Sequence, residues 1–194
     1  MAKRRVKKTA VKKKTWVSIQ APESLGKQVL GESYVEDKNN VVGKTVRANC
    51  MTLLNDPKKK RYSMSFMVDS LENDVAKTKP FAYQISPASL KIMIRKRRDR
   101  IDHMFSASTK DGHNVIVKPL ILTRGNTTND VCTAIRKAAE ESLKKSIAGL
   151  GLEELFTQVM QLKLQRELKK ELAKLYPIST SEIRVLKVKE YAQA

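Results

Sequence analysis

The sequence predicts an α+β fold, in which a mainly antiparallel, barrel-like sheet packs against α-helices and follows a disordered basic N-terminal arm. Three observations favour this class. Short runs rich in β-branched and aromatic residues are joined by hairpin signals, helical periodicity is concentrated in the second half of the chain, and no βαβ unit is repeated. With 194 residues, 41% of them hydrophobic, the chain is long enough to bury a sizeable core.

The predicted arm covers residues 1–15. It has eight basic and no acidic residues, and it cannot bury enough apolar surface to offset the entropy of ordering. We expect it to become ordered on RNA, where phosphates neutralise it. A solubilising tail or an import signal is the alternative. The following α+β domain is expected to span 16–194, with a β-rich part at 16–126, a helical part at 127–176 and a final strand at 178–191.

Strands are expected in the β-rich part at 16–19, 41–54, 60–68 and 81–85. Trp16, the one tryptophan of the chain, is expected to anchor the core. The run Asn55-Asp56-Pro57 favours a turn, because each of these residues suits turn geometry, and lysines follow it. The second and third strands should therefore form a hairpin with a basic tip made of Lys58, Lys59, Lys60 and Arg61.

A helix is expected at 87–103. Ser86 can cap it, Pro87 suits its first turn, and apolar residues recur at helical spacing. A second face of this helix carries closely spaced cations with few acids to pair with, which favours phosphate contact over an ordinary solvated face. The face consists of Lys91, Arg95 and Arg98, and Lys96 and Arg100 flank it.

A further hairpin is expected between strands at 104–108 and 115–122, because Asp111-Gly112 is a strong turn signal. Capping side chains at 127–130 favour a helix to about residue 147, where glycines would end it. The remaining elements are two amphipathic helices at 152–162 and 164–176, ended by Pro177, and a strand at 183–191.

The formal net charge of +19 indicates the class of partner. A compact chain with this surplus repels itself unless a polyanion neutralises it, so we expect nucleic acid. Aromatic residues make up 5% of the chain and form no base-stacking motif, which favours recognition of RNA shape and backbone over sequence reading. No apolar run is long enough to span a membrane, and we expect a soluble, intracellular protein.

The sequence lacks the groups of residues that catalysis or metal binding requires, which argues against an enzyme. Cys50 and Cys132 lie far apart without Cys/His spacing, so neither a disulfide nor a zinc site is indicated. His103 and His113 flank the second hairpin, yet no acid pair or cysteine accompanies them at ligand spacing, and packing or surface roles are favoured over metal binding or general-base catalysis. We expect no catalytic residue, cofactor, metal or small-molecule substrate.

Several short motifs follow one another in a defined order. They are Lys14-Thr15-Trp16, Ala21-Pro22, Leu25-Gly26, Gly43-Lys44 with Leu53 and Asn55-Asp56, Thr109-Lys110-Asp111-Gly112, Tyr176-Pro177 and Val185-Leu186-Lys187-Val188-Lys189. In their order and spacing, the chain resembles the archaeal and eukaryotic small-subunit ribosomal proteins of the S-one-e or S-three-a-e family, at the length of its shorter archaeal members. It departs from the family pattern at Lys44, Arg47 and Thr52, where arginine, glutamate and aspartate are usual.

The resemblance implies a structural constituent of the small ribosomal subunit, located on the platform near the messenger-RNA exit of cytoplasmic ribosomes. The implied partners are small-subunit ribosomal RNA, neighbouring ribosomal proteins and messenger RNA near the exit. The alternatives are a free nucleic-acid-binding factor, such as a chromatin protein or RNA chaperone, and a divergent nuclease or modification enzyme. The residues expected to bind RNA are Lys3, Arg4, Arg5, Lys7, Lys8, Lys12, Lys13, Lys14, Lys58, Lys59, Lys60, Arg61, Lys91, Arg95, Arg97, Arg98, Arg100, Lys187 and Lys189.

Overall fold

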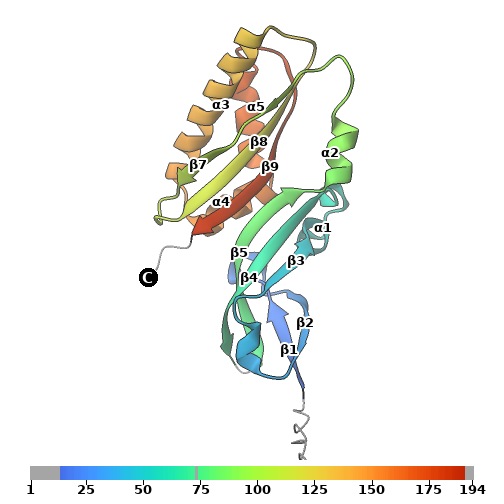
Figure 1. Ribbon diagram of the computed structural model, residues 1–194, viewed down its shortest axis with the longest axis vertical. Coiled ribbons are helices and arrows are strands. Elements are labelled where there is room, and N and C mark those ends of the chain that lie inside the picture. The colour runs from blue at the N-terminus through green and yellow to red at the C-terminus, as the bar shows by residue number, and fades with distance from the viewer. Residues whose placement is uncertain (1–13, 73, 191–194) are drawn as a thin grey trace, which may run out of the picture.

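The computed structural model describes residues 14–72 and 74–190 and has an elongated shape with two parts (Figure 1). Strands dominate one end, and long helices lie at the other end. Over the described residues the chain forms nine strands in one sheet and five α-helices. In the part of the chain that the structure describes, no helix is both long and apolar enough to cross a membrane.

The N-terminal part is a strand-rich lobe with a small core of its own. Its strands are β1 (Thr15–Gln20), β2 (Val29–Val35), β3 (Thr45–Asn49), β4 (Tyr62–Glu72) and β5 (Val75–Ile85). Its helical turns are η1 (Glu23–Leu25), η2 (Lys38–Val41), α1 (Cys50–Leu54) and η3 (Pro57–Lys59). The small core consists of Val17, Ile19, Val35, Val41, Val68 and Ala76.

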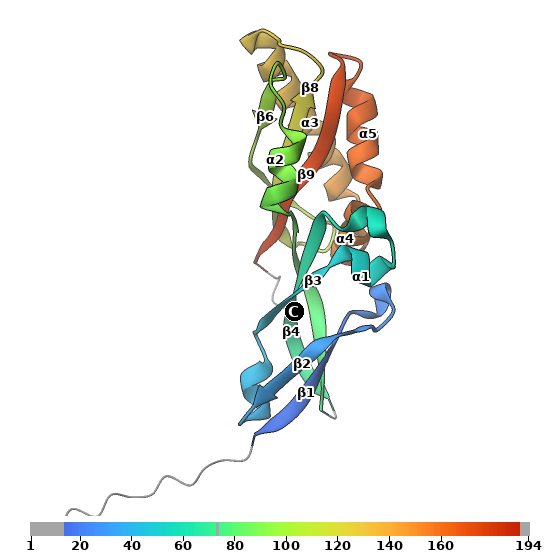
Figure 2. The ribbon, with the colours of Figure 1, turned by 90° about the vertical axis from the view of Figure 1, so that its right-hand side faces the viewer.

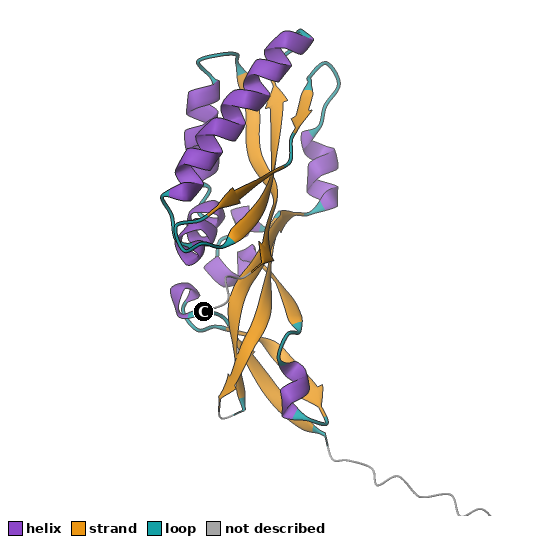
Figure 3. Ribbon diagram, turned by 60° about the vertical axis from the view of Figure 1, so that its left-hand side comes forward, coloured by secondary structure: helices purple, strands orange, loops and turns teal. Residues whose placement is uncertain are grey.

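The C-terminal part holds most of the larger core. It contains α2 (Pro87–Met93), β6 (Arg100–Asp102), β7 (Phe105–Ser108), β8 (Asn114–Thr123), α3 (Asn129–Ala148), α4 (Leu152–Met160), α5 (Lys163–Leu172) and β9 (Ile178–Glu190). Figure 3 shows the long helices covering one side of this end of the sheet. Buried side chains of these helices, such as Leu143, Phe156 and Leu168, pack against Val117 and Leu186 of the strands.

The strand order joins the two parts. It runs β2-β1-β5-β9-β8-β6; off this path β4 pairs with β5, β3 pairs with β4, and β7 pairs with β8. Within the described residues, seven strand pairs are antiparallel and the β1–β5 pair is parallel. The predicted α+β class and mainly antiparallel sheet are confirmed. The sheet is not closed, however, so a barrel-like body is not observed; β5 instead passes from one part to the other (Figure 2).

The second hairpin is confirmed, and so is the long helix after it. Thr109 and His113 bracket the turn through a backbone hydrogen bond of 3.0 Å, and Gly112 has a φ of +77°, which glycine adopts without strain. The turn also anchors a distant helix. The Asp111 carboxylate accepts a hydrogen bond of 2.7 Å from the amide of Leu152, the first residue of α4.

The predicted position of Trp16 is wrong. Alternation along β1 turns Val17 and Ile19 inward, where they are 0% and 4% exposed, so Trp16 projects outward and is 63% exposed. The strand predicted at 41–54 is also wrong in part. The Asn49 side chain accepts a hydrogen bond from the Met51 amide at 2.9 Å, which ends β3 and begins α1.

The predicted helix at 87–103 is wrong beyond Met93. Ile94 has extended backbone angles, and Arg97 has a φ of +62°, which reverses the chain. Ile101 then pairs with Ile121 in the sheet and is 2% exposed. Burial of this isoleucine by a strand replaces the expected helical turn, so the cations at 95–100 do not form a stripe on one helix.

Candidate nucleic-acid interface

The predicted basic tip is a compact corner rather than a simple hairpin turn. Asn55 ends α1 with a φ of +49°, and the Asp56 side chain accepts a hydrogen bond of 3.0 Å from the Lys58 amide, which begins η3. This double turn exposes Lys58, Lys60 and Arg61 at the surface. Capping at both turns therefore fixes where the four consecutive cations lie.

Arg47 joins this corner from β3. Its guanidinium Nη2 donates a hydrogen bond of 2.8 Å to Ser63 Oγ on the neighbouring strand β4. With Lys60 and Arg61 it lines a shallow groove of about 290 Å³. The groove lining contains three cations and no acidic residue, so it suits an anionic ligand.

A second group of cations lies on α5. Lys169 Nζ donates a hydrogen bond of 2.7 Å to the backbone oxygen of Ser179 at the start of β9. Lys169, Arg166 and Ser179 line a second groove. Arg98 contacts the same residue, since its Nη1 donates a hydrogen bond to Ser179 Oγ at 2.9 Å. Ser179 thus brings together cations from two segments about 70 residues apart in sequence.

Glu182 connects the two groups. The Tyr62 hydroxyl donates a hydrogen bond of 3.1 Å to Glu182 Oε1. Burial raises the pKa of the Glu182 carboxyl, and this hydrogen bond, the guanidinium of Arg61 and the ammonium of Lys169 oppose the shift only in part. Arg61 and Lys169 therefore both lie within electrostatic reach of one carboxyl whose charged form is disfavoured.

We call the combined surface the basic band. Its members are Arg47, Lys60, Arg61, Arg98, Arg166 and Lys169. Within the described residues none of the six forms an ion pair, and their side-chain hydrogen bonds go to neutral serine oxygens. Elsewhere cations commonly have acidic partners, as in the pairs Lys77–Glu72 at 2.6 Å and Lys79–Asp69 at 2.9 Å. The band's charge is left for an external anion.

The other predicted RNA-binding residues are more scattered. Lys91 lies on α2, Arg95 and Arg97 lie on the exposed turn after it, and Arg100 is paired with Asp102. Lys187 and Lys189 are exposed on β9, where Lys187 Nζ lies 5.2 Å from the centre of the Phe81 ring. Lys14 precedes β1. The remaining predicted residues, Lys3, Arg4, Arg5, Lys7, Lys8, Lys12 and Lys13, lie outside the described residues.

Sequence reasoning missed Arg166 and Lys169 and did not select Arg47. The signal for the first two is present, because they are three residues apart on the polar face of the predicted helix at 164–176. No comparable local signal marks Arg47. It becomes part of the site through the pairing of β3 with β4.

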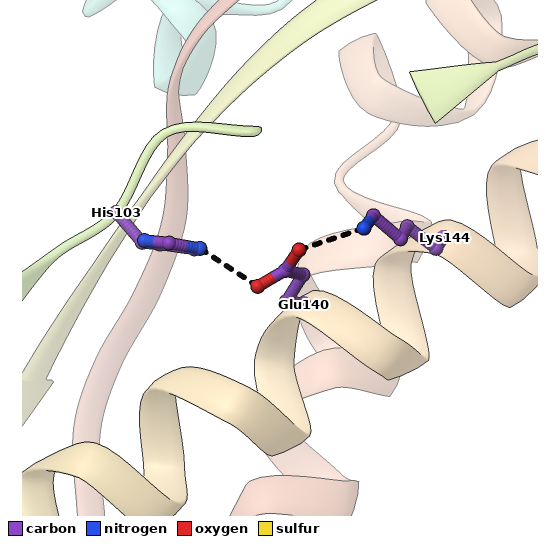
Figure 4. A network of polar contacts seen from close by, with 3 residues as sticks. All are labelled: His103, Glu140 and Lys144. Carbon is purple, nitrogen blue, oxygen red and sulfur yellow. Dashed lines mark hydrogen bonds and ion pairs between the residues drawn. The ribbon is translucent and has the colours of Figure 1, made fainter. Parts of the chain in front are cut away.

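His103 is held in a contact with α3. His103 Nε2 and Glu140 Oε2 are 2.9 Å apart, and Lys144 Nζ lies 2.7 Å from Glu140 Oε1 (Figure 4). The His103 ring also packs against Phe105, with ring centres 5.8 Å apart. Within the described residues no group of three or more His, Cys, Asp or Glu residues is arranged to hold a metal ion. The His103 arrangement fits a contact that attaches α3 to the sheet.

The two cysteines are free thiols. Cys50 lies buried in the larger core, where burial raises the pKa of its thiol to about 12. Such a group is inert as a nucleophile at neutral pH. Cys132 is partly buried at the start of α3, with its Sγ 2.9 Å from Thr127 Oγ1.

Comparisons with known proteins indicate a family for nearly the whole chain. The model of the ribosomal S3Ae family matches residues 2–192. A protein of Saccharolobus islandicus, strain L.S.2.15, is 31% identical over 92% of this chain and 88% of its own length, and one from Methanothrix thermoacetophila is 28% identical over 95% and 88%. A third, from Saccharolobus solfataricus, is 30% identical over 92% and 88%. All three are named small ribosomal subunit protein eS1.

Proposed function

Because this chain belongs to the ribosomal S3Ae family, we propose that it is a structural constituent of the small ribosomal subunit and holds ribosomal RNA through the basic band. The observation that carries the proposal is the band itself. Six cations from β3, the α1 corner, the turn after α2 and α5 converge without acidic partners among the described residues, beside a glutamate whose burial disfavours its charge.

The proposed mechanism is electrostatic and geometric. Cations of the band would replace counterions along the RNA backbone, and release of those counterions would supply binding free energy. Hydrogen bonds to Ser63 and Ser179 hold Arg47, Arg98 and Lys169 in place, so the band would bind phosphates in one arrangement. Arginines would also give two-pronged contacts to phosphate that lysines cannot.

The resemblance supports a finer proposal about location. Within cytoplasmic ribosomes the chain would occupy the platform near the messenger-RNA exit, with ribosomal RNA, adjacent ribosomal proteins and emerging messenger RNA around it. Lys58, Lys59, Lys91, Arg95, Arg97, Arg100, Lys187 and Lys189, together with the cations of residues 3–14, would make additional RNA contacts around the band.

The salt dependence of binding to small-subunit ribosomal RNA tests the band. The double variant Arg61→Gln/Arg166→Gln should bind more weakly, and its logarithmic salt slope should fall by about two, since roughly one unit is lost for each phosphate contact. The matched control Lys137→Gln/Lys145→Gln removes two exposed lysines of α3, outside the band. An equal fall in slope for both pairs would contradict a localised interface.

Sedimentation tests the ribosomal role separately. The chain should migrate with small subunits after a high-salt wash that strips loosely bound factors. A chain released entirely into the supernatant would instead be a free nucleic-acid-binding factor. Because this result does not depend on the band, the two tests can fail independently.

A further inference from the structure

Two large aromatic side chains are exposed side by side at the N-terminal end of the molecule. Trp16 of β1 and Tyr34 of β2 are directly opposite in the antiparallel register, and their ring centres lie 4.8 Å apart with planes inclined at 35°. Trp16 is 63% exposed and Tyr34 is 53% exposed. The pair thus forms a continuous aromatic surface that faces solvent.

Strand alternation explains why the side chains at positions 16 and 34 face solvent. It does not explain why both positions hold aromatic residues. Val17 and Val35, the neighbours of the two rings, fill the small core, and the opposite face of the β1–β2 ribbon must then carry Trp16 and Tyr34. A polar pair would serve there equally well for folding. The next register pair on this face is in fact polar, namely Ser18 with Glu32.

The apolar surface is therefore small and ends abruptly. It is two rings wide, with Ser18 and Glu32 at one end and Lys14 at the other. A protein partner normally needs a broader apolar patch around such anchors. Two adjacent rings bordered by charge have the size and chemistry of a surface on which one or two nucleic-acid bases stack.

The charge at one end favours RNA as the partner. Lys14 Nζ lies 5.8 Å from the centre of the Tyr34 ring and 3.8 Å from Glu36 Oε1. The chain that leads into Lys14 adds seven further cations at positions 3–13 and no acidic residue. A phosphate backbone attracted to this segment would bring its bases beside the rings.

We propose that Trp16 and Tyr34 form a stacking platform for unpaired bases of RNA. This inference rests on the proposed function, because it adds a base-contacting site to an RNA-binding protein. It also assigns different tasks to the two regions: the basic band binds phosphates of structured RNA, and the platform engages a single-stranded segment. Stacking tolerates any base, so the platform would select for unpaired strands rather than for sequence.

The sole tryptophan makes the test direct, because fluorescence excited at a wavelength that tyrosine does not absorb reports on Trp16 alone. The chain is titrated with unpaired oligoadenylate and, separately, with an RNA duplex, and the anisotropy of a label on the RNA measures binding independently. The proposal expects saturable quenching of Trp16 by oligoadenylate, and duplex binding with little quenching.

Variants separate stacking from charge. Trp16→Ser and Tyr34→Ser should each weaken oligoadenylate binding roughly tenfold, whereas Trp16→Phe should restore most of the affinity because a ring is retained. Ile92→Ser on α2, which removes another exposed apolar side chain, should change nothing. Circular dichroism confirms that each variant is folded.

The outcomes are distinguishable. Binding by anisotropy with unchanged Trp16 fluorescence and unchanged affinity of Tyr34→Ser would overturn the platform and leave the proposed function standing. If Trp16 is quenched by a neighbouring ribosomal protein and not by RNA, the two rings form a protein contact. That result would also overturn the proposed platform. Absence of any RNA binding would defeat the proposed function itself.

Discussion

His103 and Glu140 lie 2.9 Å apart, between the segment linking β6 to β7 and the middle of α3. The hydrogen bond from Lys144, and next the one from His103, lower the pKa of the Glu140 carboxyl. A carboxyl with a lowered folded-state pKa contributes stability above its unfolded-state pKa and loses it as pH falls through the folded value. The pair is thus a pH-dependent attachment of α3.

Replacement of Glu140 should reveal this dependence. We expect Glu140→Gln to lower Tm slightly at about pH 7, because the amide cannot carry the charge that Lys144 and His103 favour. The deficit should shrink towards about pH 3, because the wild-type carboxyl also takes up its proton as pH falls through the folded-state pKa. Thermal unfolding followed at both pH values measures it, and a deficit of the same size at both would contradict the argument.

The same site tests the enzyme alternative. His103→Ala should leave RNA affinity unchanged, and RNA incubated with the full chain and a divalent metal should stay intact whether or not His103 is present. His103 contacts Glu140 and Phe105 and lies outside the basic band, so we expect its loss to affect stability alone. RNA cleavage by the wild type that is lost in His103→Ala would contradict the assignment.

Glu182 should show the opposite pH dependence. The folded-state pKa of Glu182 is raised, chiefly by burial, so this carboxyl holds its proton more tightly in the folded protein than in the unfolded chain. The protein therefore loses stability as pH rises from the unfolded-state pKa through the folded-state pKa. Glu182→Gln imitates the neutral carboxyl. We therefore expect the urea midpoint of the variant to rise relative to that of the wild type as pH increases from about 4 to about 8.

A second variant at this contact provides the control. The Tyr62 hydrogen bond is the largest influence favouring the ionised form of Glu182, so Tyr62→Phe should steepen the loss of stability with pH. A constant difference between the urea midpoints of Glu182→Gln and the wild type across this pH range would contradict the argument. It would show that burial does not favour the uncharged form of the Glu182 carboxyl.

Local signals in the sequence were sufficient where a turn or cap involves neighbouring residues. The Asp111-Gly112 turn is such a case, since Gly112 supplies the positive φ that the turn requires. The helix expected to run to about residue 147 corresponds to α3, which ends at Ala148 directly before Gly149, although Thr128 makes no side-chain capping hydrogen bond. Turn residues and helix-ending glycines are properties of contiguous sequence, and no distant contact was needed to predict them.

Distant contacts explain the errors. Leu90, Ile94 and Ile101 have helical spacing, yet Ile101 is held by Ile121 in the sheet. Alternation could place Trp16 on one face of a strand but could not show which face is covered. The basic band joins residues 47, 98 and 166, and only the pairing of β3 with β4 and the position of β9 bring them together.

The contact between Asp111 and Leu152 should stabilise α4. The first amides of a helix lack partners within it, and Asp111 Oδ2 accepts one of them at 2.7 Å from a hairpin 41 residues away. Asp111→Ala should cost about 1 kcal/mol of unfolding free energy, as the loss of a capping side chain does, and Asp111→Asn should cost less because it keeps an acceptor. Equilibrium unfolding in urea provides both values. Equal losses would mean that charge, and not the hydrogen bond, matters.

Removal of residues 1–13 should separate the contribution of the N-terminal cations from that of the basic band. The cut leaves β1 and Lys14 intact and removes seven cations. If each contacts a phosphate, the logarithmic salt slope of RNA binding should fall by up to about six, and affinity at low salt should drop. A shortened chain with the wild-type slope would show that these cations contact no phosphate. A matched chain, in which the seven are replaced by glutamine at full length, should behave like the truncation, because charge and not chain length releases the counterions.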